Sequence, residues 1–212
     1  MDLTIDTLRQ RLCNPLPGWA AQQRMTGNFR PHTDVIPPNA RESAVLQILF
    51  PKDNELQLLF IRRTEDGRPH GGQISFPGGQ WETTDANFQE TALRETEEEI
   101  GVSRNHLDVL GALTPLYIPV SLFQVHPFVA CCAIRPDFTR SEAEVADILE
   151  VPLSFLFHKD NKIITEVSRA SQPDWRMEVP AYKLPDETIV WGATAMMLAE
   201  LEAVLEGEEF LR

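Results

Sequence analysis

The chain has 212 residues, of which 42% are hydrophobic and 24% are charged, and its formal net charge is -13 at pH 7. This is the composition of a globular domain with an ordinary buried core. The negative charge argues against a nucleic-acid partner, since no basic surface is evident that could neutralise a phosphate backbone. No apolar stretch is long enough to span a bilayer, and the start lacks a basic region followed by an apolar run. We therefore expect a cytoplasmic protein with no membrane partner.

Two regions can be distinguished along the chain. Leu3, Leu8 and Leu12 predict a short amphipathic helix, and a proline-rich, polar connector follows from Asn14 to Glu42. We assign residues 1–42 to this helix and connector and residues 43–212 to one domain.

The domain is predicted to mix strands with a few helices. Strand-like runs occur at residues 44–50, 56–62, 74–76, 108–113, 124–134, 162–168, 175–180 and 188–191. One helix is predicted to end before Gly101, and a last one runs from Ala193 to about Leu205. Such a mixture predicts an α/β or α+β layered domain, although the pattern does not supply the strand order.

The helix before Gly101 concentrates carboxylates on one side. At roughly 100° per residue, Glu95, Glu98 and Glu99 fall within about a third of the helix circumference, so their oxygens converge. Glu97 projects to the opposite side. Three converging carboxylates favour a hard cation, which takes oxygen ligands.

The same helix indicates how it packs. A mostly apolar stripe that could face a core is formed by Leu93, Thr96 and Ile100. Arg94 stands four positions before Glu98, the spacing at which helical side chains touch, so it can orient a carboxylate that its neighbours would repel. Gly101 suits the left-handed stop after a helix.

A solvated surface helix is the ordinary alternative for a run of glutamates. Carboxylates on one face repel each other by a few tenths of a kcal/mol per pair even when exposed. A helix that is merely soluble would more usually include lysines, and none occurs between Asn87 and Gly101. The surroundings therefore favour a binding site.

These residues resemble the Nudix box, whose form is Gly-x5-Glu-x7-Arg-Glu-U-x-Glu-Glu-x-Gly-U, with U an aliphatic residue. The matching positions are Gly79, Asp85, Arg94, Glu95, Glu98, Glu99 and Gly101. Asp85 replaces the first glutamate of the box, one extra residue follows it, and Thr96 takes an aliphatic position. The resemblance implies the Nudix fold, a mixed sheet held between helices.

A second signature precedes the box. Residues 58–64 read Leu-Leu-Phe-Ile-Arg-Arg-Thr, and residues 68–79 read Arg-Pro-His-Gly-Gly-Gln-Ile-Ser-Phe-Pro-Gly-Gly. This segment resembles the additional signature of the coenzyme A diphosphatase (CoA pyrophosphatase) branch of Nudix hydrolases, which tolerates the same extra residue in its box. Phe60 and Gly67 differ from the threonine and leucine of that signature. The resemblance covers roughly Ala44 to Leu205.

The resemblance implies roles for individual acidic residues. Glu95, Glu98 and Glu99 would bind Mg²⁺ or Mn²⁺, cations that prefer oxygen ligands. Arg94 would act with them in catalysis. Glu144 lies well downstream of the box and would be an additional ligand or the general base, and Glu98 could serve as the base instead. Spacing within one sequence does not separate these two alternatives.

The resemblance also implies a set of substrate contacts, which are Arg63, Arg68, His70, Gly78 and Gly79. A guanidinium forks onto phosphate oxygens, and glycines let the backbone approach a phosphate closely. The substrate would be an anion like the chain itself. A bound metal, with help from Arg62 and the other basic groups of this segment, would have to overcome that repulsion.

The leading hypothesis is a metal-dependent diphosphatase that splits coenzyme A or its derivatives into adenosine 3′,5′-bisphosphate and 4′-phosphopantetheine. One alternative is a Nudix hydrolase for another nucleoside diphosphate compound, such as ADP-ribose or a dinucleotide. Another is a non-catalytic module that senses a nucleotide, which loss of box carboxylates would favour, and here all three are present. The sequence leaves the acyl preference, the number of metal ions and a homodimer open.

Overall fold

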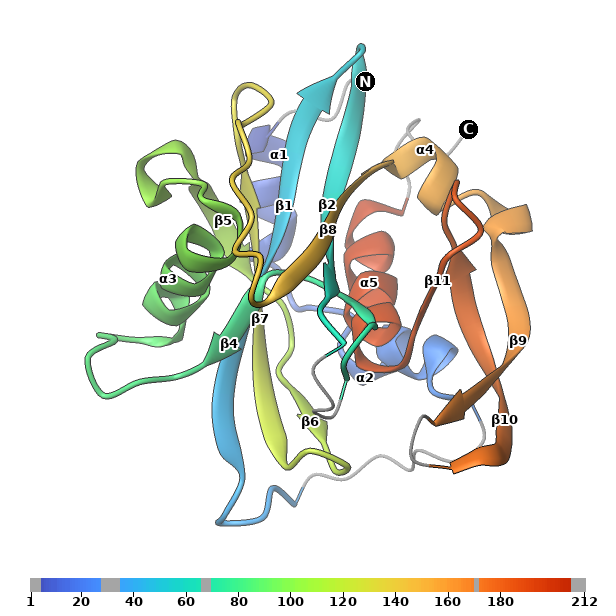
Figure 1. Ribbon diagram of the computed structural model, residues 1–212. Helices are drawn as coiled ribbons and strands as arrows, with labels where there is room; N and C mark the ends of the chain where they lie inside the picture. The colour runs from blue at the N-terminus through green and yellow to red at the C-terminus, as the bar shows by residue number, and fades with distance from the viewer. Residues whose placement is uncertain (1–4, 28–34, 66–69, 170–171, 207–212) are drawn as a thin grey trace.

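The computed structural model describes residues 5–27, 35–65, 70–169 and 172–206 (Figure 1). The helices are α1 (Ile5–Leu12), α2 (Trp19–Gln22), α3 (Phe88–Ile100), α4 (Leu153–Leu156) and α5 (Gly192–Leu205), with short 3-10 turns η1 (Gln23–Met25), η3 (Arg104–His106) and η4 (Lys159–Asn161). The strands are β1 (Arg41–Lys52), β2 (Glu55–Arg63), β3 (Ile74–Ser75), β4 (Gly78–Gln80), β5 (Asp108–Ala112), β6 (Leu116–Ile118), β7 (Phe123–Cys131), β8 (Val145–Pro152), β9 (Lys162–Arg169), β10 (Gln172–Lys183) and β11 (Ile189–Trp191).

The strands form two sheets. The larger sheet has the order β3-β2-β1-β7-β5, and β4 pairs with β1, β6 with β7 and β8 with β2. Strands β1 and β7 are parallel, whereas β1 and β2 are antiparallel, so the sheet is mixed. The smaller sheet has the order β11-β10-β9. A mixed sheet with helices on its faces confirms the predicted fold class.

The central strands are buried on both faces because α3 and α5 lie on opposite sides of the larger sheet (Figure 1). Successive β1 side chains point to alternate faces. Ile48 belongs to the core under α3, whereas its neighbour Leu49 belongs to the core that contains α5. This two-sided burial explains why β1 and β2 read as nearly continuous apolar runs in the sequence.

The ends of α3 are set by local side-chain and backbone chemistry. The Asn87 side chain accepts a hydrogen bond from the Glu90 N–H and caps the first turn. Gly101 has φ 72 and its N–H donates to the Glu97 carbonyl, so the predicted left-handed stop is confirmed. The predicted stripe of Leu93, Thr96 and Ile100 is buried.

A buried carboxylate joins the N-terminal segment to the last helix. Glu200 of α5 is fully buried and accepts hydrogen bonds from the Gly18 N–H (3.0 Å), the Gln22 amide (2.9 Å) and the Thr114 hydroxyl (2.6 Å). The donors replace the water that the carboxylate loses on burial. The connector predicted from Asn14 to Glu42 therefore contains a folded helix, α2, which propensity alone did not reveal.

Several short or polar strands were also absent from the prediction. Strand β8 pairs with β2 along most of its length, but its burial does not alternate regularly. Strands β4 and β6 are only three residues long. Their pairing partners, rather than their own composition, decide their conformation. No helix among the described residues is long and apolar enough to cross a membrane.

Gly78 is predicted to be the more sensitive of two glycines with positive φ. It has φ 149, and a Cβ there would lie 2.2 Å from the Ala44 carbonyl oxygen, whereas Gly192 has φ 64 and a Cβ there would meet nothing within 4 Å. Gly192→Ala should cost about 1–2 kcal/mol of unfolding free energy through backbone strain alone. Gly78→Ala should cost at least about 3 kcal/mol, because strain and overlap add. Urea unfolding measures both, and equal losses would contradict the expectation.

Candidate active site

The loop before α3 is joined to the helix by a two-pronged ion pair. Arg94 donates from Nε to Asp85 Oδ1 (2.9 Å) and from Nη2 to Asp85 Oδ2 (3.0 Å). The Asp85 side chain is only 5% exposed, so this pair is largely shielded from water. A bidentate guanidinium–carboxylate pair fixes the orientation of both groups. Asp85 therefore sets where the Arg94 guanidinium lies.

Asp85 also accepts bonds from its own loop and from the first turns of α3. The Glu82 N–H and the Thr91 hydroxyl both donate to Oδ2 at 3.0 Å. The hydrogen bonds from Arg94, and then these two, hold the pKa of Asp85 far below its usual value. Asp85 stays ionised and matches the charge of Arg94. The sequence showed Asp85 only as a departure from the box, since spacing across a loop gives no distance.

Arg94 also reaches two of the box glutamates. Its Nη1 donates to Glu95 Oε1 at 2.9 Å and to Glu98 Oε2 at 3.1 Å, which confirms the contact predicted from the four-residue spacing. Nη2 donates in addition to the Gln80 carbonyl. The Glu98 side chain is 56% exposed, whereas that of Glu95 is 16% exposed. Glu98 thus presents its carboxylate to solvent from a position fixed by Arg94.

Glu99 is the buried member of the cluster. Its Oε2 accepts a hydrogen bond of 2.8 Å from the Gly78 N–H, and its Oε1 lies 3.5 Å from Arg63 Nη1. Burial raises the pKa of Glu99 to about 8, and repulsion from Glu95 and Glu144 acts in the same direction. The Gly78 N–H and Arg63 therefore do not fully stabilise the ionised form of the buried Glu99 carboxyl group.

Gly79 of β4 lies directly against the Glu95 side chain of α3. A Cβ at Gly79 would lie 2.4 Å from Glu95 Cδ, so only a glycine leaves room for that carboxylate. Burial raises the pKa of Glu95, and repulsion from Glu98 and Glu144 adds to it, while Arg94 opposes it. The charge of the exposed Glu144 acts on both Glu95 and Glu99, so Glu144 lies near the cluster.

The predicted substrate contacts are distributed unevenly. Arg63 lies beside Glu99, as described above, and Gly78 and Gly79 line the carboxylates. His70 has φ 74, its Nδ1 lies 3.0 Å from Gln73 Oε1, and its buried Nε2 has no hydrogen-bond partner among the described residues. Arg68 lies outside the described residues.

Arg62 does not join this group, contrary to the expectation that it would help to offset the negative charge. It donates to Asp186 Oδ2 (3.3 Å) and Thr188 Oγ1 (3.1 Å), which belong to the β10–β11 connection. Neighbouring residues of a strand point to opposite faces, so Arg62 and Arg63 cannot both face the carboxylates. The period-two pattern of β2 could have separated them.

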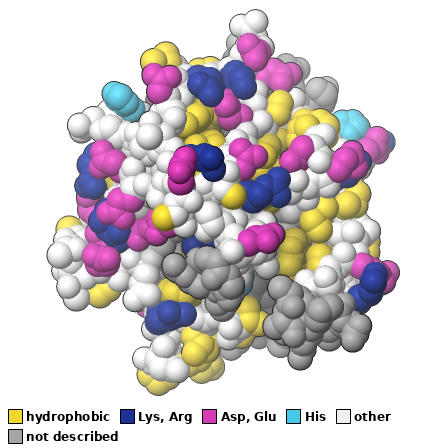
Figure 2. All heavy atoms as spheres, in the orientation of Figure 1, with side chains coloured by type: hydrophobic (Ala, Val, Ile, Leu, Met, Phe, Trp, Pro, Cys, Tyr) yellow, Lys and Arg dark blue, Asp and Glu magenta, His cyan; other side chains and the backbone are white. Residues whose placement is uncertain are grey.

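The carboxylates of the cluster outnumber the guanidinium groups beside them. Figure 2 shows Lys and Arg side chains interspersed with Asp and Glu on the face that it presents. Around Arg94 and Arg63, by contrast, five carboxylates face two guanidinium groups: Asp85, Glu95, Glu98, Glu99 and Glu144. When all are ionised, three negative charges remain unmatched there.

Comparison with known proteins identifies the family. Residues 40–167 match the family model of the NUDIX domain. The chain is 39% identical over 144 residues to the uncharacterized Nudix hydrolase NudL of Pectobacterium atrosepticum, covering 68% of this chain and 72% of that protein. It is 33% identical over 180 residues to the NudL protein of Yersinia enterocolitica, covering 85% and 86%.

A solved structure shows the same fold. The MutT/nudix family protein from Enterococcus faecalis is 17% identical, with a TM-score of 0.50 over 87% of this chain and 69% of that one. Fold and site together define a hydrolase that acts on a diphosphate compound. The chain belongs to the Nudix hydrolase family.

Members of this family typically use a divalent metal, and the donor set here fits one. The cluster offers carboxylate oxygens, which Mg²⁺ and Mn²⁺ prefer, and it carries the unmatched negative charge that a cation would balance. As the side chains stand, however, no three acidic, histidine or cysteine groups in the described part of the chain are gathered into a metal site. The guanidinium of Arg94 lies between Glu95 and Glu98. The expected convergence of three glutamates is therefore only partly formed.

Loss of the Asp85 carboxylate should destabilise the protein, because it leaves Arg94 without its principal partner. Asp85→Asn should lower the unfolding free energy by about 3–5 kcal/mol, as for other shielded ion pairs that lose one member. Glu90→Gln is the matched control, since Glu90 pairs with Arg104 at an exposed site, where less than about 1 kcal/mol is expected. Urea unfolding of both variants measures the difference, and a loss at Asp85 as small as that at Glu90 would refute the role given to the fork.

Proposed function

We propose that this Nudix hydrolase is a Mg²⁺- or Mn²⁺-dependent diphosphatase that hydrolyses coenzyme A or its derivatives. Water is added across the P–O–P bridge, and the products are adenosine 3′,5′-bisphosphate and 4′-phosphopantetheine or its acyl form. The observation that carries the proposal is the unmatched carboxylate cluster beside Gly78 and Gly79, together with the upstream signature that ends in these glycines.

The chemistry requires that negative charge near phosphorus be offset while water attacks. A bound divalent metal would supply charge neutralisation at the phosphate oxygens. We assign Glu95, Glu98 and Glu99 to hold it. Arg94 holds Glu95 and Glu98 in place through its hydrogen bonds, and Gly78 fixes Glu99 through its N–H.

The substrate side of the site is assigned to the segment that joins β2 to β4. Arg63 ends β2 beside Glu99, from where its guanidinium can fork onto a phosphate oxygen. The His70 ring nitrogen Nε2 has no hydrogen-bond partner in the described part of the chain, and we assign it to the same ligand. Arg68 is proposed as a further phosphate contact from its place in the signature alone.

The proton of the attacking water needs a carboxylate acceptor, for which Glu98 and Glu144 are the two candidates. Both are exposed, and both belong to the cluster. Glu98 is already oriented by Arg94, whereas the Glu144 backbone is hydrogen-bonded to Thr64 and Ser141. Glu144→Gln and Glu98→Gln in the same assay distinguish the base, because losing it lowers kcat more than it raises KM.

Replacing Glu98 by Gln should remove most turnover and leave the fold intact. We expect a loss of about 10²–10⁴-fold in kcat, the usual contribution of a general base, with a further loss if the residue also holds the metal. Glu97→Gln is the control, because Glu97 lies on the opposite side of α3 and pairs with Arg104. Coenzyme A hydrolysis by Glu98→Gln at the rate of Glu97→Gln would show that the carboxylates are wrongly assigned.

The substrate itself is tested with a panel of diphosphates in the presence of Mg²⁺ or Mn²⁺. Coenzyme A, its oxidised and acylated forms, ADP-ribose and NADH are compared by kcat/KM, and the products are identified by mass. We expect coenzyme A or a derivative to be preferred by at least tenfold, with adenosine 3′,5′-bisphosphate as a product. Preference for ADP-ribose or NADH would replace the substrate assignment, and binding without turnover of any member would favour a nucleotide-sensing module.

A further inference from the structure

Among the described residues, the smaller sheet ends in β9, which no other strand pairs with on its outer side. Strand β9 pairs with β10 and is the last strand in the order β11-β10-β9. Figure 1 shows it at the right-hand margin of the molecule, away from α3. A free edge of this kind exposes backbone N–H and C=O groups that can pair with another strand.

Pro180 determines which backbone groups of β9 face the open side. It lies directly opposite Ile164, and proline has no N–H to donate to a ladder. The Ile164–Pro180 pair is therefore a non-hydrogen-bonded pair of the antiparallel ladder, and the N–H and C=O of Ile164 point outward. The same phase turns the backbone groups of Lys162 and Glu166 outward. The Lys162 N–H already donates to the Lys159 carbonyl, and the Lys162 C=O points outward because its pair with Tyr182 has the same phase as the Ile164–Pro180 pair.

The side chains along this edge place opposite charges on the two sides of an exposed isoleucine. Ile164 is 68% exposed, Lys162 precedes it by two positions, and Glu166 follows it by two. All three point to one face of the strand. Lys162 is anchored by a contact of 2.5 Å with the buried Glu202, so little side-chain freedom is lost if it meets a second partner.

We infer that β9 pairs with β9 of a second copy of this chain, antiparallel and centred on Ile164. The two Ile164 residues exchange N–H···O bonds across the twofold axis, and each Glu166 N–H donates to the Lys162 carbonyl of the other copy. Lys162 of one copy then lies beside Glu166 of the other at both ends of the contact. The two sheets become one continuous sheet across the dimer.

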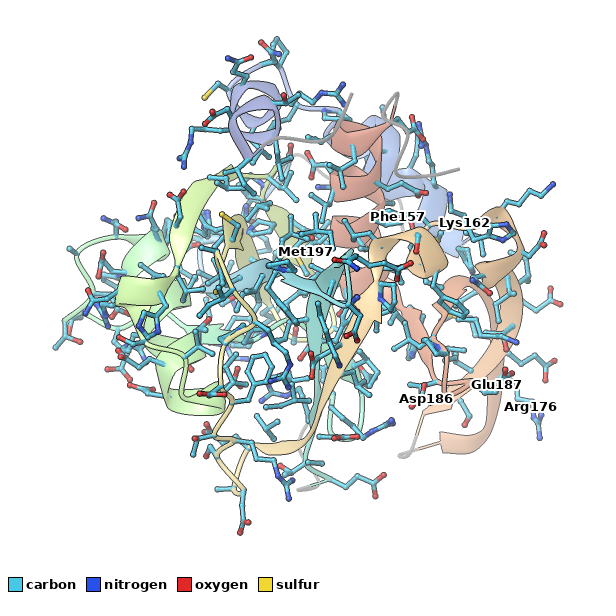
Figure 3. All side chains as sticks on the ribbon, turned by 90° about the horizontal axis from the view of Figure 1, so that it is seen from above. Phe157, Lys162, Arg176, Asp186, Glu187 and Met197 are labelled. Carbon is cyan, nitrogen blue, oxygen red and sulfur yellow. The ribbon has the colours of Figure 1, made fainter. Side chains whose placement is uncertain are left out.

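The charges select this register against its alternatives. A parallel, in-register pairing would place Lys162 against Lys162 and Glu166 against Glu166, which is destabilising. If the register shifted by one residue, the outward N–H and C=O groups of one copy would no longer lie opposite those of the other. The Lys162 and Glu166 side chains of the two copies would then point to opposite faces. Figure 3 shows Arg176 pointing away from the body of the molecule on β10, where it contacts Glu166 at 3.1 Å.

The contact is tested by measuring mass in solution by sedimentation across micromolar to millimolar protein concentrations. The wild-type mass is expected to rise from that of one chain toward that of two. Ile164→Asp should remain monomeric, because it places two carboxylates together at the twofold axis. Ile134→Asp is the control, since Ile134 is 76% exposed and lies outside the small sheet, and it should dimerise like the wild type.

A crosslink tests the register directly. In a hydrogen-bonded antiparallel pair the facing Cα atoms are about 5.5 Å apart, a separation that a disulfide spans. Ile164→Cys in a Cys13→Ser background should form a disulfide-linked dimer on mild oxidation, and Ile134→Cys in that background should not; Cys131 and Cys132 are buried. A wild-type chain that stays monomeric throughout overturns the inference, as does a dimer that survives Ile164→Asp and gives no crosslink. Neither result bears on the hydrolase chemistry, since β9 contributes no residue to the carboxylate cluster.

Discussion

The site depends on one guanidinium. Arg94 bonds at the same time to Asp85 in the preceding loop, to the Gln80 carbonyl at the end of β4, and to Glu95 and Glu98 on its own helix. Because the ionised Asp85 already balances much of the Arg94 charge, Arg94 offsets the charge of the glutamates only in part and chiefly holds them at fixed positions. Loop, strand and helix are thereby tied to one another at the point where the carboxylates gather.

Packing elsewhere in the molecule offsets the unfavourable free energy of holding carboxylates close together and partly shielded from water. Burial raises the pKa of both Glu95 and Glu99, so the cluster itself opposes folding when its members are charged. The opposite side of α3 supplies the compensating contacts, since Leu93 and Ile100 are buried in the core shared with β1 and β2. An electrostatic penalty at a site, offset by ordinary packing elsewhere, is typical of functional centres.

Periodic features could be predicted from the sequence, and contacts between distant segments could not. Helical spacing identified the acidic face of α3, the contact between Arg94 and Glu98, and the end at Gly101. Strands β4 and β8 pair with strands far along the chain, β6 is only three residues long, and α2 depends on Glu200. The bidentate ion pair between Asp85 and Arg94 joins a loop to a helix, and no spacing rule gives the distance across that loop. Local pattern therefore predicts the orientation of the site residues better than it predicts what holds them.

The C-terminal part of the chain lies beyond the matched NUDIX region, yet it contacts the strands that carry the site, β2 and β3. Thr194 at the start of α5 donates to the Ile74 carbonyl of β3, and Arg62 of β2 is held by Asp186 and Thr188. Strand β3 leads directly into Gly78, whose N–H binds Glu99. The last helix and the small sheet thus position the glycine turn from one face while α3 contacts it from the other. A Nudix core without this support would leave the glycine turn fixed on one side only.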